Sequence, residues 1–324
     1  MRTAFSSDAR FLDHDTGAGH PERAARISHT LDYLQTQPWF SSLEKVSASA
    51  CEPEAILSMH DPALLSRAKA SCDQGRPYLD TPDVAISGES FDIARLAVGT
   101  MLTLSDNIMS GSVDNGFALI RPPGHHAEHG EALGFCLFNN IAITARYLQQ
   151  QHGLEKILIV DWDVHHGNGT QHLFEEDPSV FFISTHQYPH YPGTGSRSET
   201  GIGAGQGATL NCPMNAGADD EDYQAAFKEK ILPAIHSFKP DMILISAGFD
   251  AHRADPLGAI NLSTAHYGWM TERLMECADQ YCNGRLLSAL EGGYDLDALA
   301  QSVATHLSVL SGQHSEQNSN PSPQ

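Results

Sequence analysis

Three side chains in one short segment have the types and spacing of metal ligands. Asp161, Asp163 and His165 follow an apolar run, and their i, i+2, i+4 spacing points all three in one direction if the segment stays extended. Carboxylate and imidazole groups bind Zn²⁺, and a catalytic zinc needs three protein ligands and an open position. Asp250 follows another apolar run far along the chain and could be the third ligand. A single Asp-x-His pair, taken alone, also fits an ordinary capped loop.

Two further motifs could move protons and stabilise developing charge. His125 and His126 follow a rigid Pro-Pro-Gly turn and could be metal ligands, or an acid and a base that titrate near neutral pH. The alternative is a surface pair, in a chain with 18 histidines. In Gly292-Gly293-Tyr294, the glycines allow a sharp turn and the phenol could donate a hydrogen bond to an oxyanion. On its own, that tyrosine also fits a loop cap.

The elements that must position these residues are predicted from apolar patterns. Strands alternating with helices predict a parallel sheet covered on both faces, and unbroken apolar runs are typical of strands buried on both sides. The predicted strands are Phe117–Ile120, Ile157–Val160, Val180–Ser184, Met242–Ser246 and Leu286–Leu290, with Ala208–Cys212 as a further candidate. The predicted helices are Phe91–Met109, Asn140–Gln151, Asp219–His236 and Ala265–Tyr281.

A polar or glycine-rich segment comes directly after each of four predicted strands. These segments read R-P-P-G-H-H, D-W-D-V-H-H-G-N-G-T, A-G-F-D-A-H and E-G-G-Y-D. Because ligands of open parallel sheets bind beyond the carboxyl ends of the strands, we expect these four loops to meet at one edge. The glycine string 201–207 precedes a strand-like segment instead of a helix, so we interpret it as a loop and not as a dinucleotide-binding turn.

Composition sets limits on the class of protein and its partners. The 324 residues are 41% hydrophobic and 18% charged, which indicates a globular domain, placed at residues 1–310, with a polar tail at 311–324 that we expect to be disordered. The net charge of −21 disfavours nucleic acid and anionic membranes as partners. No signal peptide is expected in the first 30 residues, and the six scattered cysteines form no C-x-x-C pair. A cytoplasmic location is therefore expected.

Taken together, the motifs resemble histone deacetylases. R-P-P-G-H-H, G-F-C-L-F-N-N, D-W-D-V-H-H-G-N-G-T, Y-P-G-T-G, S-A-G-F-D-A-H and E-G-G-Y occur in the family's order, and Gly19–Arg23 is similar to the class II branch and its bacterial amidohydrolase relatives. The match runs from about Gly19 to about Leu310. The resemblance implies the α/β arginase–deacetylase fold, with three layers and a central, mostly parallel sheet of about eight strands flanked by helices.

The resemblance also implies the chemical roles. It places Zn²⁺ on Asp163, His165 and Asp250, a ligand set that Fe²⁺ could also occupy. We favour His126 as the main base and His125 as its electrostatic partner, although the sequence leaves their order open. The remaining implied roles are a hydrogen bond from Tyr294 to the substrate carbonyl oxygen, Asp161 as partner of His125, and Asn168 as partner of His126, where class I relatives have a carboxylate.

Further residues are implied to hold a second cation and the substrate. A buried K⁺ site would use Asp161, Ser184 and Thr185, with backbone oxygens of Asp163 and His165. The substrate-binding residues would be Phe135 and Tyr191 as walls of a narrow tunnel, Gly134 as acceptor of the substrate's amide N–H, Asp83 at the rim, and Leu257 in D-P-L-G.

Acetyl-lysine in peptides or proteins is the preferred substrate class, and three alternatives remain. Acetylpolyamine amidohydrolases of the class II branch have a glutamate where Leu257 stands, while the net acidity of this chain favours polycations. A binuclear manganese ureohydrolase would need a carboxylate where Gly167 stands. A non-catalytic module would be expected to lose a metal ligand or Tyr294, and this chain retains them. The sequence leaves the preferred acyl length and the oligomeric state open.

Overall fold

A single parallel sheet of eight strands runs through the centre of the molecule in the computed structural model, which describes residues 1–313. All neighbouring strands are parallel, in the order β2-β1-β3-β8-β7-β4-β5-β6. The strands are β1 Thr3–Ser6, β2 Glu44–Lys45, β3 Asn115–Ala118, β4 Ile157–Asp161, β5 Val180–Gln187, β6 Thr209–Met214, β7 Met242–Ala247 and β8 Leu286–Leu290. The tail predicted to be disordered lies, from residue 314 onward, outside the described residues.

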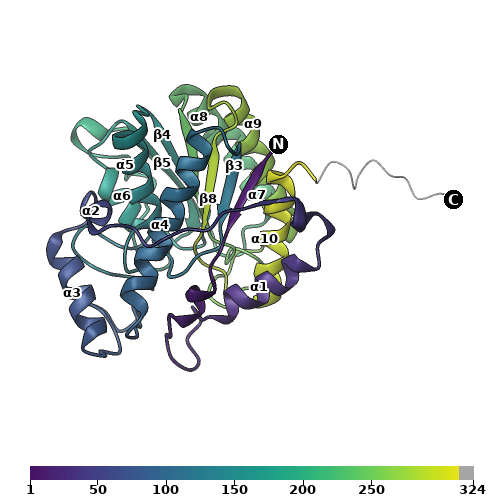
Figure 1. Cartoon of the computed structure of the whole chain (residues 1–324). Coiled ribbons are helices and arrows are strands. Elements are labelled where there is room, and N and C mark those ends of the chain that lie inside the picture. The colour runs from purple at the N-terminus through teal and green to yellow at the C-terminus, as the bar shows by residue number, and fades with distance from the viewer. Residues whose placement is uncertain (314–324) are drawn as a thin grey trace.

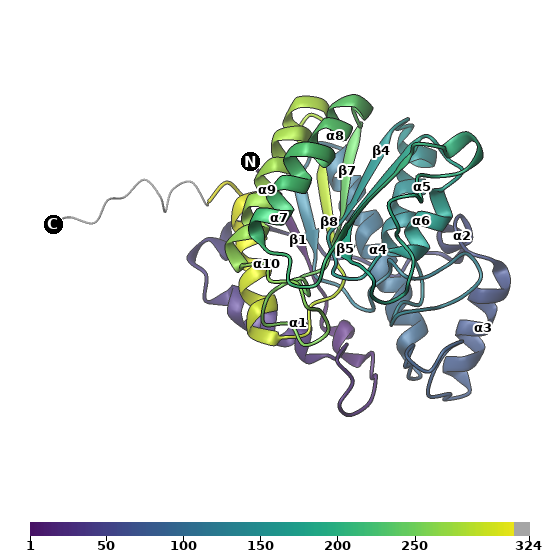
Figure 2. The same cartoon turned by 180° about the vertical axis from the view of Figure 1, so that it is seen from behind.

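Helices cover both faces of this sheet, so the architecture has three layers (Figures 1 and 2). Helices α4 and α5 lie against one face, while α8, α9 and α10 cover the other and α1 packs on α10. The helices are α1 Ala25–Gln35, α2 Pro53–Leu57, α3 Pro62–Asp73, α4 Ser90–Met109, α5 Asn140–His152, α6 Asn168–Phe174, α7 Asp220–Ala226, α8 Leu232–Phe238, α9 Thr264–Tyr281 and α10 Leu296–Leu310. Because both faces are covered, every residue of β4, β7 and β8 is buried.

The predicted fold class is confirmed, although several element bounds were wrong. β3 begins at Asn115 and ends at Ala118, so Leu119 and Ile120 lie beyond the strand as the chain turns toward Pro122. β5 continues to Gln187, past the predicted end at Ser184, because it pairs with β6 over that length. The helix predicted over Asp219–His236 contains a π-helical stretch at Phe227–Ile231. Strands β1 and β2 and helices α1, α2, α3, α6 and α10 were not predicted.

Four adjacent strands carry the polar loops identified in the sequence. They are β3, β8, β7 and β4, which lie side by side in the middle of the sheet. Since all four are parallel, the loops that follow them meet at one edge, as predicted. The topology therefore places histidines, carboxylates and Tyr294 from four distant segments in one region.

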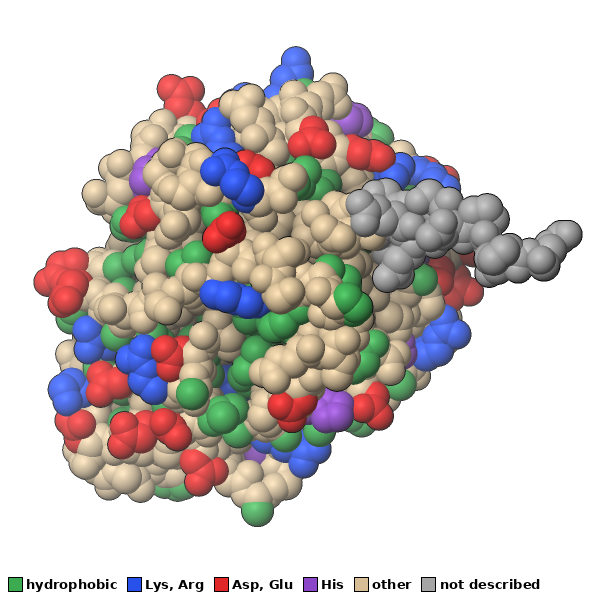
Figure 3. All heavy atoms as spheres, turned by 45° about the vertical axis from the view of Figure 1, so that its right-hand side comes forward, with side chains coloured by type: hydrophobic (Ala, Val, Ile, Leu, Met, Phe, Trp, Pro, Cys, Tyr) green, Lys and Arg blue, Asp and Glu red, His purple; other side chains and the backbone are tan. Residues whose placement is uncertain are grey.

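The surface carries acidic and basic side chains interspersed on the face seen in Figure 3. Within residues 1–313, no helix is long and apolar enough to cross a membrane. The six cysteines are all buried and none is in a disulfide, in agreement with the prediction that they form no disulfide framework.

Candidate active site

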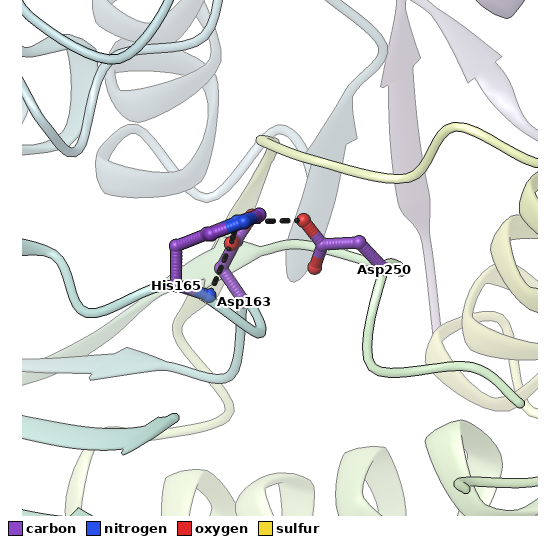
Figure 4. A group of neighbouring side chains, drawn as sticks. All are labelled: Asp163, His165 and Asp250. Carbon is purple, nitrogen blue, oxygen red and sulfur yellow. Dashed lines mark hydrogen bonds and ion pairs between the residues drawn. The ribbon is translucent and has the colours of Figure 1, made fainter. Parts of the chain in front are cut away.

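Asp163, His165 and Asp250 lie together at the carboxyl edge of the sheet (Figure 4). The first two follow β4 and the third follows the neighbouring strand β7. One potential ligand atom from each lies within 4.8 Å of the others, and all three residues are buried. His165 Nδ1 lies 3.1 Å from Asp163 Oδ1 and 3.2 Å from Asp250 Oδ2. The three predicted ligands are therefore brought together by the fold.

Asp161 does not point into this cluster, because the segment 161–165 does not stay extended, which was the condition for all three side chains to point in one direction. Strand β4 ends at Asp161, and the chain bends over residues 163–165. The Asp161 carboxylate instead accepts a hydrogen bond from His125 Nδ1 at 2.9 Å through Oδ2, and one from the Asp163 backbone N–H at 3.1 Å through Oδ1. Asp161 is thus placed as the partner of His125.

The electrostatics of the cluster fit a bound cation. Burial and repulsion by Asp163 raise the pKa of Asp250 to about 7. Burial lowers the pKa of His165, but hydrogen bonds to Asp163 and Asp250 raise it more, to about 10. Asp250 Oδ2 is buried and has no hydrogen-bond partner, although it contacts His165. Two buried carboxylates thus need positive charge, which a divalent cation would supply while leaving the imidazole neutral for coordination.

Glycines let the backbone approach the cluster closely. A Cβ added at Gly292 would overlap the Oδ2 atom of Asp250, and one at Gly248 would overlap the Oδ2 atom of Asp163. The Gly292 N–H also donates to Asp163 Oδ2 at 2.7 Å. The glycines of E-G-G-Y and A-G-F-D therefore leave space for the carboxylates, a role that the sequence reasoning did not assign to them.

His125 and His126 are both buried, with ring centroids 4.0 Å apart. His126 Nδ1 donates to Asn168 Oδ1 at 2.7 Å, the partner that the sequence predicted. Burial lowers the pKa of His126 well below its usual value, and nearby His125 and His165 lower it further. Burial also lowers the pKa of His125, but Asp161 and Asp163 raise it more, to about 10. The two histidines therefore differ: His126 favours its neutral form and His125 its charged form.

A cavity of about 180 Å³ opens beside these histidines. All five residues predicted to bind substrate line this cavity, and so do His126, His165 and Tyr294. The lining residues are Asp83, His126, Gly134, Phe135, His165, Tyr191, Leu257 and Tyr294. At the cavity, Asp83 Oδ2 accepts hydrogen bonds from the Gly134 N–H at 3.1 Å and the Tyr191 hydroxyl at 3.4 Å.

The three side chains predicted for a potassium site are buried, and one of them, Asp161, contacts His125. Ser184 pairs with Asp161 in the register of β4 and β5, and Thr185 follows it in β5. The Ser184 hydroxyl lies 2.9 Å from His186 Nδ1. The potassium site itself stays a prediction.

A buried charge cluster that sequence reasoning missed supports the site. The Glu22 carboxylate accepts two hydrogen bonds of 2.8 Å from Arg121 and one of 3.1 Å from Arg26. Arg26 also donates to the Gly293 carbonyl at 2.7 Å and lies 5.0 Å from the centre of the Tyr294 ring. Glu22 lies in the segment Gly19–Arg23 and Arg121 begins the motif R-P-P-G-H-H, so the opposite charges of these two residues were the signal that could have indicated the pair.

Two other carboxylates fix the active-site backbone and were also missed. Glu291 Oε2 accepts hydrogen bonds from the backbone N–H groups of Gly124 at 2.6 Å and His125 at 3.2 Å. Asp255 Oδ2 accepts from the Tyr294 N–H at 2.6 Å. Both lie in motifs quoted above, but their partners are far away in sequence. These contacts hold the histidine pair and the tyrosine in place.

Comparison with known proteins identifies the family. A model described as "Histone deacetylase domain" matches residues 20–310. Histone deacetylase 14, chloroplastic, of Arabidopsis thaliana is 40% identical over 315 residues, covering 91% of this chain and 74% of that protein. The probable deacetylase of Archaeoglobus fulgidus is 40% identical over 302 residues, covering 92% and 82%. Human polyamine deacetylase HDAC10 is 39% identical over 306 residues, covering 90% and 44%.

A solved structure agrees with these relatives. The crystal structure of the HDA15 HD domain matches with a TM-score of 0.91 at 40% identity, covering 96% of this chain and 88% of that one. Together with the family model and these relatives, the fold and the buried cluster define a deacetylase, a hydrolase whose fold implies a catalytic metal. The chain belongs to the histone deacetylase family, as its motifs predicted.

Proposed function

We propose that this deacetylase removes the acetyl group from acetyl-lysine side chains of peptides or proteins, with Zn²⁺ held by Asp163, His165 and Asp250. The observation that carries the proposal is the cavity of about 180 Å³ lined by Phe135 and Tyr191, which also has His126, His165 and Tyr294 in its lining. An unbranched acetylated side chain suits such a cavity, because its methylene groups would lie against Phe135 and Tyr191.

The residues around the cavity suggest how the amide is hydrolysed. Bound zinc would polarise the acetyl carbonyl and lower the pKa of a water molecule. His126 holds its proton on Nδ1 against Asn168, which leaves Nε2 free to accept a proton from the attacking water and return it to the departing amine. His125, charged and paired with Asp161, would stabilise negative charge that develops nearby. The Tyr294 hydroxyl would donate a hydrogen bond to the carbonyl oxygen as it becomes negative.

Leu257 supports acetyl-lysine over acetylpolyamines. It lines the cavity and has no charge with which to bind a distant ammonium group. The opposite argument is the net charge of −21, together with the carboxylate of Asp83 at the cavity, both of which favour cations. Acetylpolyamine hydrolysis is therefore the second candidate function.

A direct comparison of substrates tests the choice. Zinc-loaded enzyme would be assayed with an acetyl-lysine peptide and with N-acetylputrescine, and we expect the higher kcat/KM for the peptide. Leu257→Glu should shift the ratio of the two kcat/KM values toward acetylputrescine. Leu257→Gln, which introduces a neutral side chain of the same size as glutamate, should shift this ratio much less. A higher kcat/KM for acetylputrescine in the unmodified enzyme would reject the preference for lysine.

We further propose a buried K⁺ bound by Asp161, Ser184 and Thr185, and a cytoplasmic location. The adjacency of Asp161 and Ser184 in the sheet supports the potassium site. The six buried cysteines, which form no disulfides, support the cytoplasmic location. Metal analysis after dialysis against K⁺-free and Na⁺-free buffer would test the potassium site, and localisation of a tagged chain would test the compartment.

A further inference from the structure

A carboxylate outside the catalytic cavity contacts the amide that supports His126. Glu128, two residues after His126, accepts a hydrogen bond from Asn168 Nδ2 at 2.5 Å through Oε1. The other end of the same amide, Asn168 Oδ1, accepts the hydrogen bond from His126 Nδ1. A continuous chain of hydrogen bonds therefore runs from Glu128 through Asn168 to His126.

The direction of the Asn168 amide decides which nitrogen of His126 carries the proton. With Oδ1 toward the ring, His126 Nδ1 must be a donor and Nε2 keeps a free lone pair. If the amide were reversed, Nδ2 would donate to Nδ1 and the proton would move to Nε2, which could then accept nothing. A carboxylate at position 168 would present an acceptor oxygen to His126 in either orientation. Asparagine does so in only one orientation, so a further group is needed to orient its amide.

Two acceptors hold the amide in the productive direction. Besides the Glu128 carboxylate, the His126 carbonyl lies 3.3 Å from Asn168 Nδ2, a long and therefore weak hydrogen bond. Reversal would place Asn168 Oδ1 against a carboxylate and a carbonyl, both of which repel it. The charged acceptor contributes most, because hydrogen bonds to ionised groups are about twice as strong as neutral ones.

Hydrogen bonds to neighbouring residues fix both the side chain and the backbone of Glu128. His172 of α6 donates to Glu128 Oε1 from Nδ1 at 2.8 Å, and this hydrogen bond raises the pKa of His172. The Glu128 backbone is fixed as well, since its carbonyl lies 2.8 Å from His60 Nδ1 and its N–H donates to the Glu131 carbonyl at 2.9 Å. The Glu128 side chain is only 22% exposed.

We propose that Glu128 is a positioning residue for deacetylation: it orients the Asn168 amide and thereby keeps His126 in the tautomer with a free Nε2. The proposal rests on the proposed function, in which His126 is the base. Glu128 does not line the cavity, so its effect on catalysis passes through Asn168.

Glu128→Gln is the informative change, because glutamine has the same shape and can present either an amide oxygen or an amide NH₂ to Asn168. The full chain, loaded with zinc, would be assayed with an acetyl-lysine peptide. We expect kcat to fall about ten- to hundred-fold, the size expected when a charged hydrogen-bond acceptor is replaced, with KM within about two-fold, zinc content unchanged and the chain still folded at the assay temperature. Glu176→Gln, an exposed residue near the end of α6, is the charge-matched control and should leave kcat unchanged.

A second substitution separates orientation from a general structural role. Asn168→Asp alone would place two carboxylates in contact and should lower kcat. Combined with Glu128→Gln, it should restore activity above both single variants, because the new carboxylate offers an acceptor to His126 in either direction and glutamine can donate to it. A double variant whose loss is the product of the two single losses would overturn the proposal.

Long-range ¹H–¹⁵N correlation spectra of the histidine rings read the tautomer directly, independently of turnover. His126→Ala identifies the His126 signals. The Nδ1–H form is expected in the unmodified enzyme, with Nε2–H appearing in Glu128→Gln. An unchanged tautomer in Glu128→Gln would refute the orienting role. If His126→Ala kept full activity, His126 would not be the base and the proposed mechanism would fail, while the tautomer spectra would still decide what Glu128 does.

Discussion

Gly292→Ala should weaken zinc binding without disturbing the fold, because the new methyl group would enter the space of two ligand carboxylates. Gly292 follows β8, and its Cβ would overlap Asp250 Oδ2 and lie 2.6 Å from Asp163 Oδ2. Its φ is outside the left-handed region, so alanine brings no backbone strain there. The change therefore acts on the positions of the carboxylates.

The distances set the size of the effect. An ordinary van der Waals contact of a Cβ begins at 3.4 Å, so Asp163 Oδ2 would have to move from 2.6 Å to that distance, a shift of at least 0.8 Å. Metal–ligand distances tolerate deviations of only about 0.2 Å. At least one carboxylate would thus leave its place, and we expect zinc affinity to fall on the order of 100-fold, or about 2.7 kcal/mol.

Zinc affinity would be measured by competition with a chromophoric chelator, alongside kcat and the Tm of the metal-free protein. Gly88→Ala is the matched control, since its Cβ would have no atom within 4 Å and its φ is not left-handed. Gly248→Ala, which also meets Asp163 Oδ2, should repeat the effect. If Gly292→Ala bound zinc within about three-fold of the unmodified chain, the idea that these carboxylates hold the metal here would be wrong.

Three other changes test the catalytic and structural roles. Tyr294→Phe should lower kcat about 10²- to 10³-fold, the cost of losing one oxyanion donor, while metal analysis finds zinc retained; undiminished turnover would remove Tyr294 from the mechanism. Glu22→Gln should destabilise the fold by about 3–5 kcal/mol in urea unfolding, because two buried guanidinium groups lose their carboxylate; an unchanged midpoint would argue against the buried cluster. Burial lowers the pKa of His306 to about 3 from its usual 6.5, so only the unfolded chain binds this proton between those pH values. Stability should therefore fall with decreasing pH by up to about 1.4 kcal/mol per unit from this group, and His306→Gln should reduce the slope measured between pH 7 and pH 5.

The sequence by itself determined the class of fold and the chemistry of the site. Runs such as Ile157–Val160 and Met242–Ser246 are apolar throughout, so burial on both faces of a parallel sheet can be inferred from local composition. Polar loops after four of these runs predicted a shared edge, and the residue types in them predicted metal binding and proton transfer. Short strands could not be predicted: β1 and β2 have only four and two residues, too few to show a periodic pattern of apolar residues.

Only the tertiary structure decided where the individual side chains point. Asp161 turns to His125 because β4 ends there and the chain bends, which spacing alone could not indicate. Glu22 meets Arg121 across 99 positions of sequence, and Glu128 meets Asn168 across 40. Residue types and local periodicity predict elements, but a hydrogen bond or ion pair depends on the relative placement of segments that only the folded sheet brings together.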